Sequence, residues 1–352
     1  MRIAVDVTPL SVPRSGIGNY IRGAVSGLDA AGCEAVPFAL TDAEGAGRIA
    51  AALGGGEPRI LRAPAANVAR RGWSALGRPP LERWLGAVDA TLLSDWWYPP
   101  QRGGLRATVV HDLVPLHHPE WVSRRTLLGH RATYRRLLPG CDVVFANSAY
   151  TRDDAVQTLG LDPARVVVAR PGVDARFTVD GPAADLGTPY VLALGTLEPR
   201  KNLAALVEAK RRHSGLPEVA LVGGEGWGDV PSLEAPGVRR LGYVDDERAV
   251  ELMRGAACLV FPSLYEGFGM PVVEAMACGC PVACSSHPSL DEACGDAAVR
   301  FDAADPDDLA RAVREILATR DALRERGLAH ARGFTWAATG AAIRDGYRSS
   351  SP

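Results

Sequence analysis

Short apolar runs alternate with longer amphipathic segments along most of the chain. Apolar runs of strand length lie at 3–7, 35–39, 90–93, 108–110, 143–146 and 166–169, and again at 190–194, 219–222 and 258–261. Helical periodicity predicts helices near 45–53, 66–86, 123–138 and 149–159, one from 245, and three more at 305–319, 321–332 and up to about 347. This alternation is typical of parallel sheets covered by helices, so the sequence predicts an α/β fold.

A composition shift near the middle divides this pattern in two. The segment 180–189 is rich in Gly, Pro and Ala and separates the strand pattern at 166–169 from the one at 190–194. A chain of 352 residues that is 47% hydrophobic is long enough to build two sizeable cores. We therefore expect two domains.

Composition and charge exclude several classes of partner. A net charge of −2 argues against a nucleic-acid-binding protein. The seven cysteines lie mostly in apolar runs without paired CxxC spacing, and Cys278 and Cys280 are too close for the usual zinc arrangement. No apolar run reaches 18 residues, and the chain passes from Met1 straight into a strand pattern. We expect reduced cysteines, no bound metal and a cytoplasmic protein.

The stretch PSLYEGFGMPVVEAM (262–276) carries the most informative chemistry. With the apolar run before it, the stretch predicts a strand, then a loop, then a helix. Pro271 suits the first turn of that helix. Gly267 and Gly269 let the backbone approach a ligand, and N–H groups at a helix start can hold phosphate or sugar oxygens. Glu266 and Glu274 flank this corner as hydrogen-bond acceptors. Such a corner suits a polyhydroxylated ligand with a diphosphate.

Together with the following ACGCPV (277–282), this stretch closely resembles the signature of the retaining glycosyltransferases of family 4. These enzymes have two Rossmann-like domains facing each other across a cleft, the GT-B fold. The resemblance implies that Glu266 faces the donor sugar and that Glu274 binds the ribose of the nucleotide. We include Gly267, Phe268 and Gly269 in the expected donor site.

Two strand ends in the first half carry further candidate residues. A glycine-containing turn with Gly16 and Gly18 follows the first strand, and His111 follows the strand at 108–110. On spacing alone, the turn could equally be tight without a ligand, and a lone histidine is more often structural. The resemblance favours a role at the donor for both: the glycine loop near acceptor and phosphates, and His111 as a sugar contact that stabilises the transition state, oriented by Asp112.

The loop GTLEPRKN (195–202) contains two adjacent cations, Arg200 and Lys201. The chain has 37 arginines and only two lysines, so Lys201 indicates a position that needs a compact point charge, although two lysines must fall somewhere. In the resembled family an arginine and a lysine at this loop hold the donor diphosphate. Arg200 and Lys201 are therefore expected to neutralise charge on the departing phosphate.

Two further loops are expected to line the nucleotide pocket. Gly223 follows the strand at 219–222, and Tyr243 and Val244 precede the helix from 245. The resemblance implies that backbone near Tyr243 and Val244 reads the base, while the glycines alone also fit ordinary turns.

Elsewhere, Arg124, Arg131 and Arg135 share one helix face, which is either solvated or rests peripherally on anionic lipid.

The resemblance covers nearly the whole chain. It implies an N-terminal acceptor-side domain (1–175), a nucleotide-sugar-binding domain (186–333) and a C-terminal helix that crosses back to the first domain (334–352). The implied activity is transfer of a hexose from GDP-mannose or a UDP-hexose to a hydroxyl of a sugar, lipid-linked or small-molecule acceptor. The resemblance also implies that the anomeric configuration is retained and that the reaction requires no cofactor and no metal ion. A nucleotide-sugar 2-epimerase and a non-catalytic nucleotide-sugar-binding subunit remain as alternatives.

Overall fold

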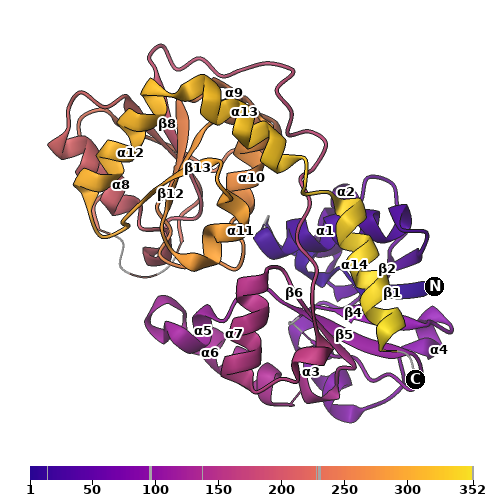
Figure 1. Cartoon of the computed structure of the whole chain (residues 1–352). Helices are drawn as coiled ribbons and strands as arrows, with labels where there is room; N and C mark the ends of the chain where they lie inside the picture. Colours follow the sequence, from indigo (N-terminus) through magenta and orange to yellow (C-terminus); the bar gives the residue numbers. More distant parts are fainter. Residues whose placement is uncertain (14, 95–96, 137, 227, 229–230, 351–352) are drawn as a thin grey trace. The chain divides into compact units, whose positions relative to one another are not determined.

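The computed structural model describes the chain except for residues 14, 95–96, 137, 227, 229–230 and 351–352 (Figure 1). The chain forms two compact units. Unit 1 comprises Met1–Leu113, Leu128–Gly172 and Thr335–Pro352, and unit 2 comprises Val114–Leu127 and Val173–Phe334. Each unit is built on its own parallel sheet, which confirms the predicted α/β class with two Rossmann-like domains.

Unit 1 contains a seven-stranded parallel sheet with the order β3-β2-β1-β4-β5-β6-β7. The strands are β1 (Arg2–Asp6), β2 (Glu34–Thr41), β3 (Arg59–Arg62), β4 (Ala90–Leu93), β5 (Leu105–Val110), β6 (Val143–Ala146) and β7 (Val166–Val168). The helices between and after them are η1 (Thr8–Ser11), α1 (Gly16–Ala30), α2 (Ala43–Ala52), α3 (Ala66–Leu76), α4 (Glu82–Leu85), η3 (Leu138–Gly140), α7 (Ala149–Leu159), η4 (Pro163–Arg165) and α14 (Trp336–Ser349). Helix α6 (Arg124–Arg136) begins in the segment grouped with unit 2, which also contains α5 (Val114–His117) and η2 (Pro119–Trp121).

The last helix, α14, packs against the first, α1, although they are separated by nearly the whole sequence (Figure 1). Gly27 of α1 and Gly340 of α14 permit close approach, because a Cβ on Gly27 would lie 2.1 Å from the carbonyl oxygen of Trp336. Tyr347 is fully buried and its hydroxyl donates to the carbonyl oxygen of Thr91 at 2.8 Å. The C-terminal helix is therefore part of the core of unit 1.

Unit 2 contains a six-stranded parallel sheet with the order β10-β9-β8-β11-β12-β13. The strands are β8 (Tyr190–Leu194), β9 (Glu218–Val222), β10 (Val238–Gly242), β11 (Cys258–Phe261), β12 (Val282–Ser285) and β13 (Ala298–Phe301). The helices are η5 (Pro199–Lys201), α8 (Leu203–Arg212), α9 (Asp246–Gly255), α10 (Met270–Ala277), η6 (Pro288–Leu290), α11 (Asp291–Cys294), α12 (Pro306–Ala318) and α13 (Arg320–Ala331).

Both faces of the second sheet are buried, which explains its continuous apolar strands. On β8, Leu192 packs into the cluster formed with α9 and α10, whereas Val191 and Ala193 pack into the cluster formed with α8 and α12. A strand covered on both faces needs apolar residues at successive positions rather than at alternate ones. All seven cysteines are buried and none forms a disulfide, as their apolar surroundings indicate.

The predicted single helix over 66–86 is wrong. The structure places α3 at Ala66–Leu76 and the short α4 at Glu82–Leu85, because Gly77 ends α3 in a left-handed conformation (φ 64°) and two prolines follow. Four strands were not predicted: β3, β10, β12 and β13. Strand β10 is an edge strand that contains two adjacent arginines, and none of its residues is fully buried. Strand β3 is a four-residue edge strand with an arginine at each end, and β12 and β13 are equally short, so none of them produces a clear periodic signal.

Replacing Gly27 by Ala should destabilise the protein by about 1–3 kcal/mol, since the new methyl group collides with backbone that cannot move alone. Gly47→Ala in α2 is the matched control. Gly47 is exposed, and a Cβ there meets no atom within 4 Å, so this change should raise stability slightly. Denaturant unfolding measures both, and equal stability of the two variants would contradict the close packing of α1 on α14.

Candidate active site

The strand order of unit 2 brings two distant loops together. Strand β8 pairs in parallel with β11, so their carboxyl ends lie at the same edge of the sheet. The loop after β8 contains η5 with Arg200 and Lys201, and the loop after β11 contains Glu266. Pairing of these strands therefore places both cations at the carboxylate.

Arg200 and Lys201 each contact a different oxygen of Glu266. Arg200 Nη1 lies 2.6 Å from Oε2, and Lys201 Nζ lies 2.6 Å from Oε1. Arg200 also donates to the carbonyl oxygen of Tyr265 at 2.9 Å and to Glu198 Oε1 at 2.7 Å. The exposed fractions of the Arg200, Lys201 and Glu266 side chains are only 17%, 13% and 10%. We call Glu198, Arg200, Lys201 and Glu266 the charge cluster.

The charge cluster keeps Glu266 ionised. Burial alone would raise the pKa of Glu266, but the charges of Arg200 and Lys201, with the hydrogen bond from Lys201, outweigh it and lower the pKa to about 2. At neutral pH the carboxylate can therefore only accept hydrogen bonds. Each oxygen has further lone-pair capacity, which sugar hydroxyls can use.

Lys201 is positioned by the backbone beneath its side chain. A Cβ on Gly195, at the end of β8, would lie 3.3 Å from Lys201 Cε, so the aliphatic part of the lysine crosses the strand end closely. Its ammonium lies 5.1 Å from the centroid of the Phe261 ring. This compact route suits a flexible, unbranched side chain and explains in part why lysine stands here in an arginine-rich chain.

Helix α10 begins beside Glu266 in sequence. Its N-cap residue is Gly269, with φ 95°, and no side chain caps the helix. Pro271 carries no N–H group and the N–H of Val272 donates to the carbonyl oxygen of Gly269 at 3.0 Å, so only the other N–H groups of the first turn are suited to ligand oxygens. Pro271 occupies the first turn, as predicted. Glu274 is half-buried on this helix, whereas Phe268 is buried and packs on Phe334 with ring centroids 5.5 Å apart. Any donor contact of Phe268 must therefore involve its backbone.

The residues predicted to line the nucleotide pocket lie in two loops of unit 2. Gly223 follows β9 with φ 155°, and a Cβ there would lie 1.9 Å from the carbonyl oxygen of Gly195, so packing alone requires glycine. Tyr243 is 65% exposed, and Val244 packs partly against the core. The predicted contact of these residues with the base stays a prediction.

Gly16 and Gly18 lie at the start of α1 in unit 1. Ser15 caps this helix by accepting from the N–H of Gly18 at 3.1 Å. A Cβ on Gly16 would meet no described atom within 4 Å, and one on Gly18 would make ordinary contacts. Packing among the described residues thus does not require either glycine, unlike Gly223, and their predicted ligand role remains open to test.

His111 lies directly after β5, at the carboxyl edge of the first sheet. Its ring meets that of Tyr20 edge to face, with centroids 5.0 Å apart, and its Nε2 is buried without a hydrogen-bond partner among the described residues. Burial, reinforced by the nearby His130, lowers the pKa of His111 to about 4. The imidazole is therefore neutral at pH 7 and has an unsatisfied nitrogen.

Two residues that support the charge cluster were not predicted from the sequence. Glu198 is buried, and its Oε1 pairs with Nη2 of the Arg200 guanidinium. Ser289, in η6, accepts from the backbone N–H of Glu266 at 3.0 Å and so fixes the loop. The adjacency of Glu198 to the two cations was visible in the sequence, but nothing there indicated that Ser289 reaches this loop.

The two halves of the chain match known protein families. Residues 14–177 match Glycosyltransferase Family 4, and residues 188–319 match Glycosyl transferases group 1. An O-antigen chain mannosyltransferase B from Escherichia coli is 30% identical over 266 residues, which cover 68% of this chain and 69% of that protein. An alpha-maltose-1-phosphate synthase from Mycolicibacterium smegmatis (strain ATCC 700084 / mc(2)155) is 30% identical over 291 residues, covering 69% and 74%.

The fold also resembles solved structures over nearly its full length. Anabaena Alr3699/HepE, solved with UDP and glucose, superposes with a TM-score of 0.72 at 16% sequence identity and covers 98% of each chain. With the family matches, this establishes the GT-B fold. The chain belongs to glycosyltransferase family 4, and it is a glycosyltransferase.

The described residues bear on the predictions of membrane and metal binding. No helix there combines the length and apolarity that crossing a bilayer requires. Within the same residues, no group of three or more His, Cys, Asp and Glu side chains is arranged to hold a metal ion. Peripheral lipid contact and metal independence stay predictions.

Glu266→Gln should lower the free energy of unfolding by about 3 kcal/mol at pH 7, because the two cations lose a buried counter-charge. The folded pKa of Glu266 lies below its ordinary value of 4.5, so the stabilisation is present above that pH and is lost as the pH falls toward 2. The difference in the free energy of unfolding between the variant and the wild type should therefore become smaller from pH 5 to pH 3, as measured by denaturant unfolding.

Glu225→Gln is the matched control for this pH series. Glu225 pairs with Arg240 at the surface and its side chain is 81% exposed, so its loss should change stability by about 0.5 kcal/mol or less. A pH-independent difference for Glu266→Gln would show that the carboxylate does not depend on these cations.

Proposed function

We propose that the protein transfers a hexose from a nucleotide sugar to an acceptor hydroxyl with retention of anomeric configuration. The observation that carries this proposal is the charge cluster at the carboxyl edge of the second sheet, where an ionised Glu266 is held by Arg200 and Lys201. A sugar diphosphate needs both parts. Hydroxyls require an acceptor, and phosphates require cations and backbone N–H groups.

In the proposed step, the bond between the anomeric carbon and the diphosphate oxygen breaks as the acceptor oxygen bonds to that carbon from the same face. The leaving group gains negative charge, which Arg200 and Lys201 are suited to neutralise because both are fixed and little exposed. The acceptor proton passes to an oxygen of the departing diphosphate. The products are a glycoside and a protonated nucleoside diphosphate.

The remaining residues are assigned to binding. Glu266 would accept hydrogen bonds from the sugar hydroxyls, and Glu274 on α10 would accept from the ribose. Since His111 is neutral at pH 7, we assign it a hydrogen bond with the sugar rather than an ionic contact. Gly16 and Gly18 are assigned to the donor phosphates, and Gly223, Tyr243 and Val244 to the nucleotide.

The comparisons favour one donor without excluding others. The Escherichia coli relative bears the name mannosyltransferase, which supports GDP-mannose, while the Anabaena structure contains UDP and glucose, which keeps a UDP-hexose in the panel. A panel of nucleotide sugars, followed by mass spectrometry of the released nucleotide and of the product, tests the proposal. Isomerised donor in the absence of acceptor would instead indicate a 2-epimerase.

Lys201→Ala should lower turnover by about 10²–10³-fold, because one fixed charge at the developing diphosphate is lost. The expected loss lies in kcat, measured as release of nucleoside diphosphate from the best donor of the panel. Arg240→Ala, which removes an exposed arginine from unit 2, should leave kcat unchanged. Near wild-type turnover in a folded Lys201→Ala variant would remove the charge cluster from the mechanism.

Turnover should persist in excess EDTA, since the proposal assigns charge neutralisation to Arg200 and Lys201. The measurement is the same release of nucleoside diphosphate, before and after chelation. Activity that disappears with EDTA and returns with added Mg²⁺ or Mn²⁺ would contradict the assignment.

A further inference from the structure

The peptide bond between Tyr265 and Glu266 is held from both sides. Its carbonyl oxygen accepts from Arg200 Nη1 at 2.9 Å, and its N–H group, on Glu266, donates to Ser289 Oγ at 3.0 Å. Ser289 is only 1% exposed, so this hydroxyl satisfies a backbone donor that is shielded from water. Because the peptide leads directly into Cα of Glu266, its orientation determines where the carboxylate lies.

Ser289 is oriented in turn by His287, which caps η6. Nδ1 of the imidazole accepts from the N–H group of Ser289 at 3.2 Å and lies 2.8 Å from Ser289 Oγ. As an acceptor, Nδ1 carries no proton, so the proton of the neutral ring is on Nε2. The Ser289 hydroxyl accepts from Glu266, and its own hydrogen is therefore available to Nδ1. One chain of hydrogen bonds thus runs from His287 through Ser289 to the backbone of Glu266.

Groups from several elements face His287. The Tyr265 ring lies with its centroid 5.3 Å away, and Arg300 of β13 donates from Nη2 to the carbonyl oxygen of His287 at 3.1 Å. Burial lowers the pKa of His287 below its ordinary value of 6.5. The charge of His118 adds to this effect, Asp291 of α11 opposes it, and Arg300 adds to it. The imidazole is therefore neutral at pH 7.5 and can act as an acceptor.

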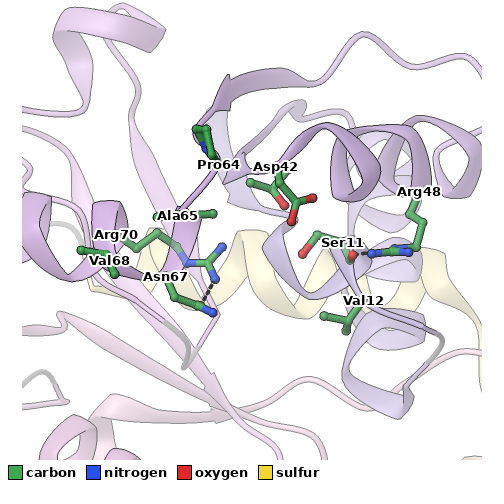
Figure 2. Close-up of a pocket in the computed structure, with 11 residues that line it drawn as sticks. Ser11, Val12, Asp42, Arg48, Pro64, Ala65, Asn67, Val68 and Arg70 are labelled. Carbon is green, nitrogen blue, oxygen red and sulfur yellow. Dashed lines mark hydrogen bonds between the residues drawn. The ribbon is translucent and has the colours of Figure 1, made fainter.

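A histidine is exceptional as a cap in this chain. Apart from η6, the described helices that are capped by a side chain use Ser, Thr or Asp. Asp42, for example, lines the pocket shown in Figure 2 and accepts from the N–H group of Gly45 at 2.7 Å, at the start of α2. Ser and Thr do not titrate and Asp keeps its charge above about pH 5, so these caps persist on mild acidification. The cap at His287 is lost when the ring is protonated.

We propose that His287 is a positioning residue of the transfer reaction, which holds the Tyr265–Glu266 peptide through Ser289 and does so only as a neutral imidazole. Protonation turns Nδ1 from an acceptor into a donor, so two N–H groups then point at each other and the ring separates from Ser289. Glu266 then shifts away from the position in which it accepts from the donor sugar, and kcat falls. The inference rests on the proposed function, because that proposal assigns the sugar to Glu266.

The other titratable residues assigned to the sugar keep their charge over the range of pH that matters. The pKa is about 2 for Glu266 and about 4 for His111, so neither titrates appreciably between pH 7.5 and pH 5. A fall of kcat over this range is therefore expected from His287. Variants at this position separate its titration from that of the facing His118.

Two variants test the acceptor and its titration separately. His287→Leu removes the acceptor and should lower kcat at pH 7.5 by about fivefold or more, measured as release of nucleoside diphosphate. His287→Asn supplies an amide oxygen that is not protonated in this range, so it should keep about half of the kcat or more at pH 7.5 and lose the fall that the wild type shows toward pH 5. His213→Leu is the matched control. His213 pairs with Asp307 at the surface of unit 2, so this change should leave kcat and its pH profile as in the wild type.

Ser289→Ala tests whether the effect of His287 passes through the Ser289 hydroxyl. This change removes the group between His287 and Glu266, so adding His287→Leu to it should lower kcat no further. Full additivity of the two losses would contradict the proposed chain of hydrogen bonds.

NMR titration of the whole, isotope-labelled protein tests the same chain of hydrogen bonds without any donor. From pH 7.5 to pH 5, the amide signals of Ser289 and Glu266 should shift together with the His287 ring in the wild type, and this amide shift should vanish in His287→Asn. Coupled signals in a protein that turns over no nucleotide sugar would support the chain and contradict only the proposed function. The inference is overturned if the Glu266 amide does not follow the ring, if His287→Asn keeps the wild-type pH profile, or if His287→Leu and His213→Leu have equal kcat.

Discussion

The carboxylate of Glu266 can remain ionised in its buried position only because a cation contacts each of its oxygens. This constraint fixes much of the surrounding structure. Lys201 reaches the carboxylate by passing closely over Gly195, and Gly195 in turn leaves no room for a side chain at Gly223. The Nη2 atom of Arg200 pairs with Glu198, which is also buried. The loops at this edge of the sheet are thus arranged around one set of charges.

Such an arrangement is suited to a reaction in which charge moves. Fixed charges need no rearrangement when negative charge appears on a leaving group. Partial exclusion of water from the site strengthens the electrostatic interaction of each charge. The cluster holds two cations against two carboxylates, Glu198 and Glu266, so it is balanced without ligand. An arriving diphosphate adds negative charge, while sugar hydroxyls use the lone pairs of Glu266 that the cations leave open.

The sequence predicted the α/β class and many strands, because strands buried on both faces are continuous apolar runs. It failed where this signal is weak: the edge strands β3 and β10, the short β12 and β13, and the break in the helix after Gly77. For the charge cluster, the resemblance indicated Arg200, Lys201 and Glu266 as residues of one site. Their contacts could not be predicted from spacing, since β8 and β11 are neighbours only through the order of the folded sheet. Ser289 was missed for the same reason, whereas the contact of Glu198 with Arg200 is local in the sequence.

The most direct test is a crystal structure of the protein with the nucleotide sugar that supports turnover. The account predicts diphosphate oxygens within hydrogen-bond distance of Arg200 and Lys201, and a sugar hydroxyl donating to Glu266. A diphosphate bound elsewhere, with Arg200 and Lys201 still paired only to carboxylates, would contradict it.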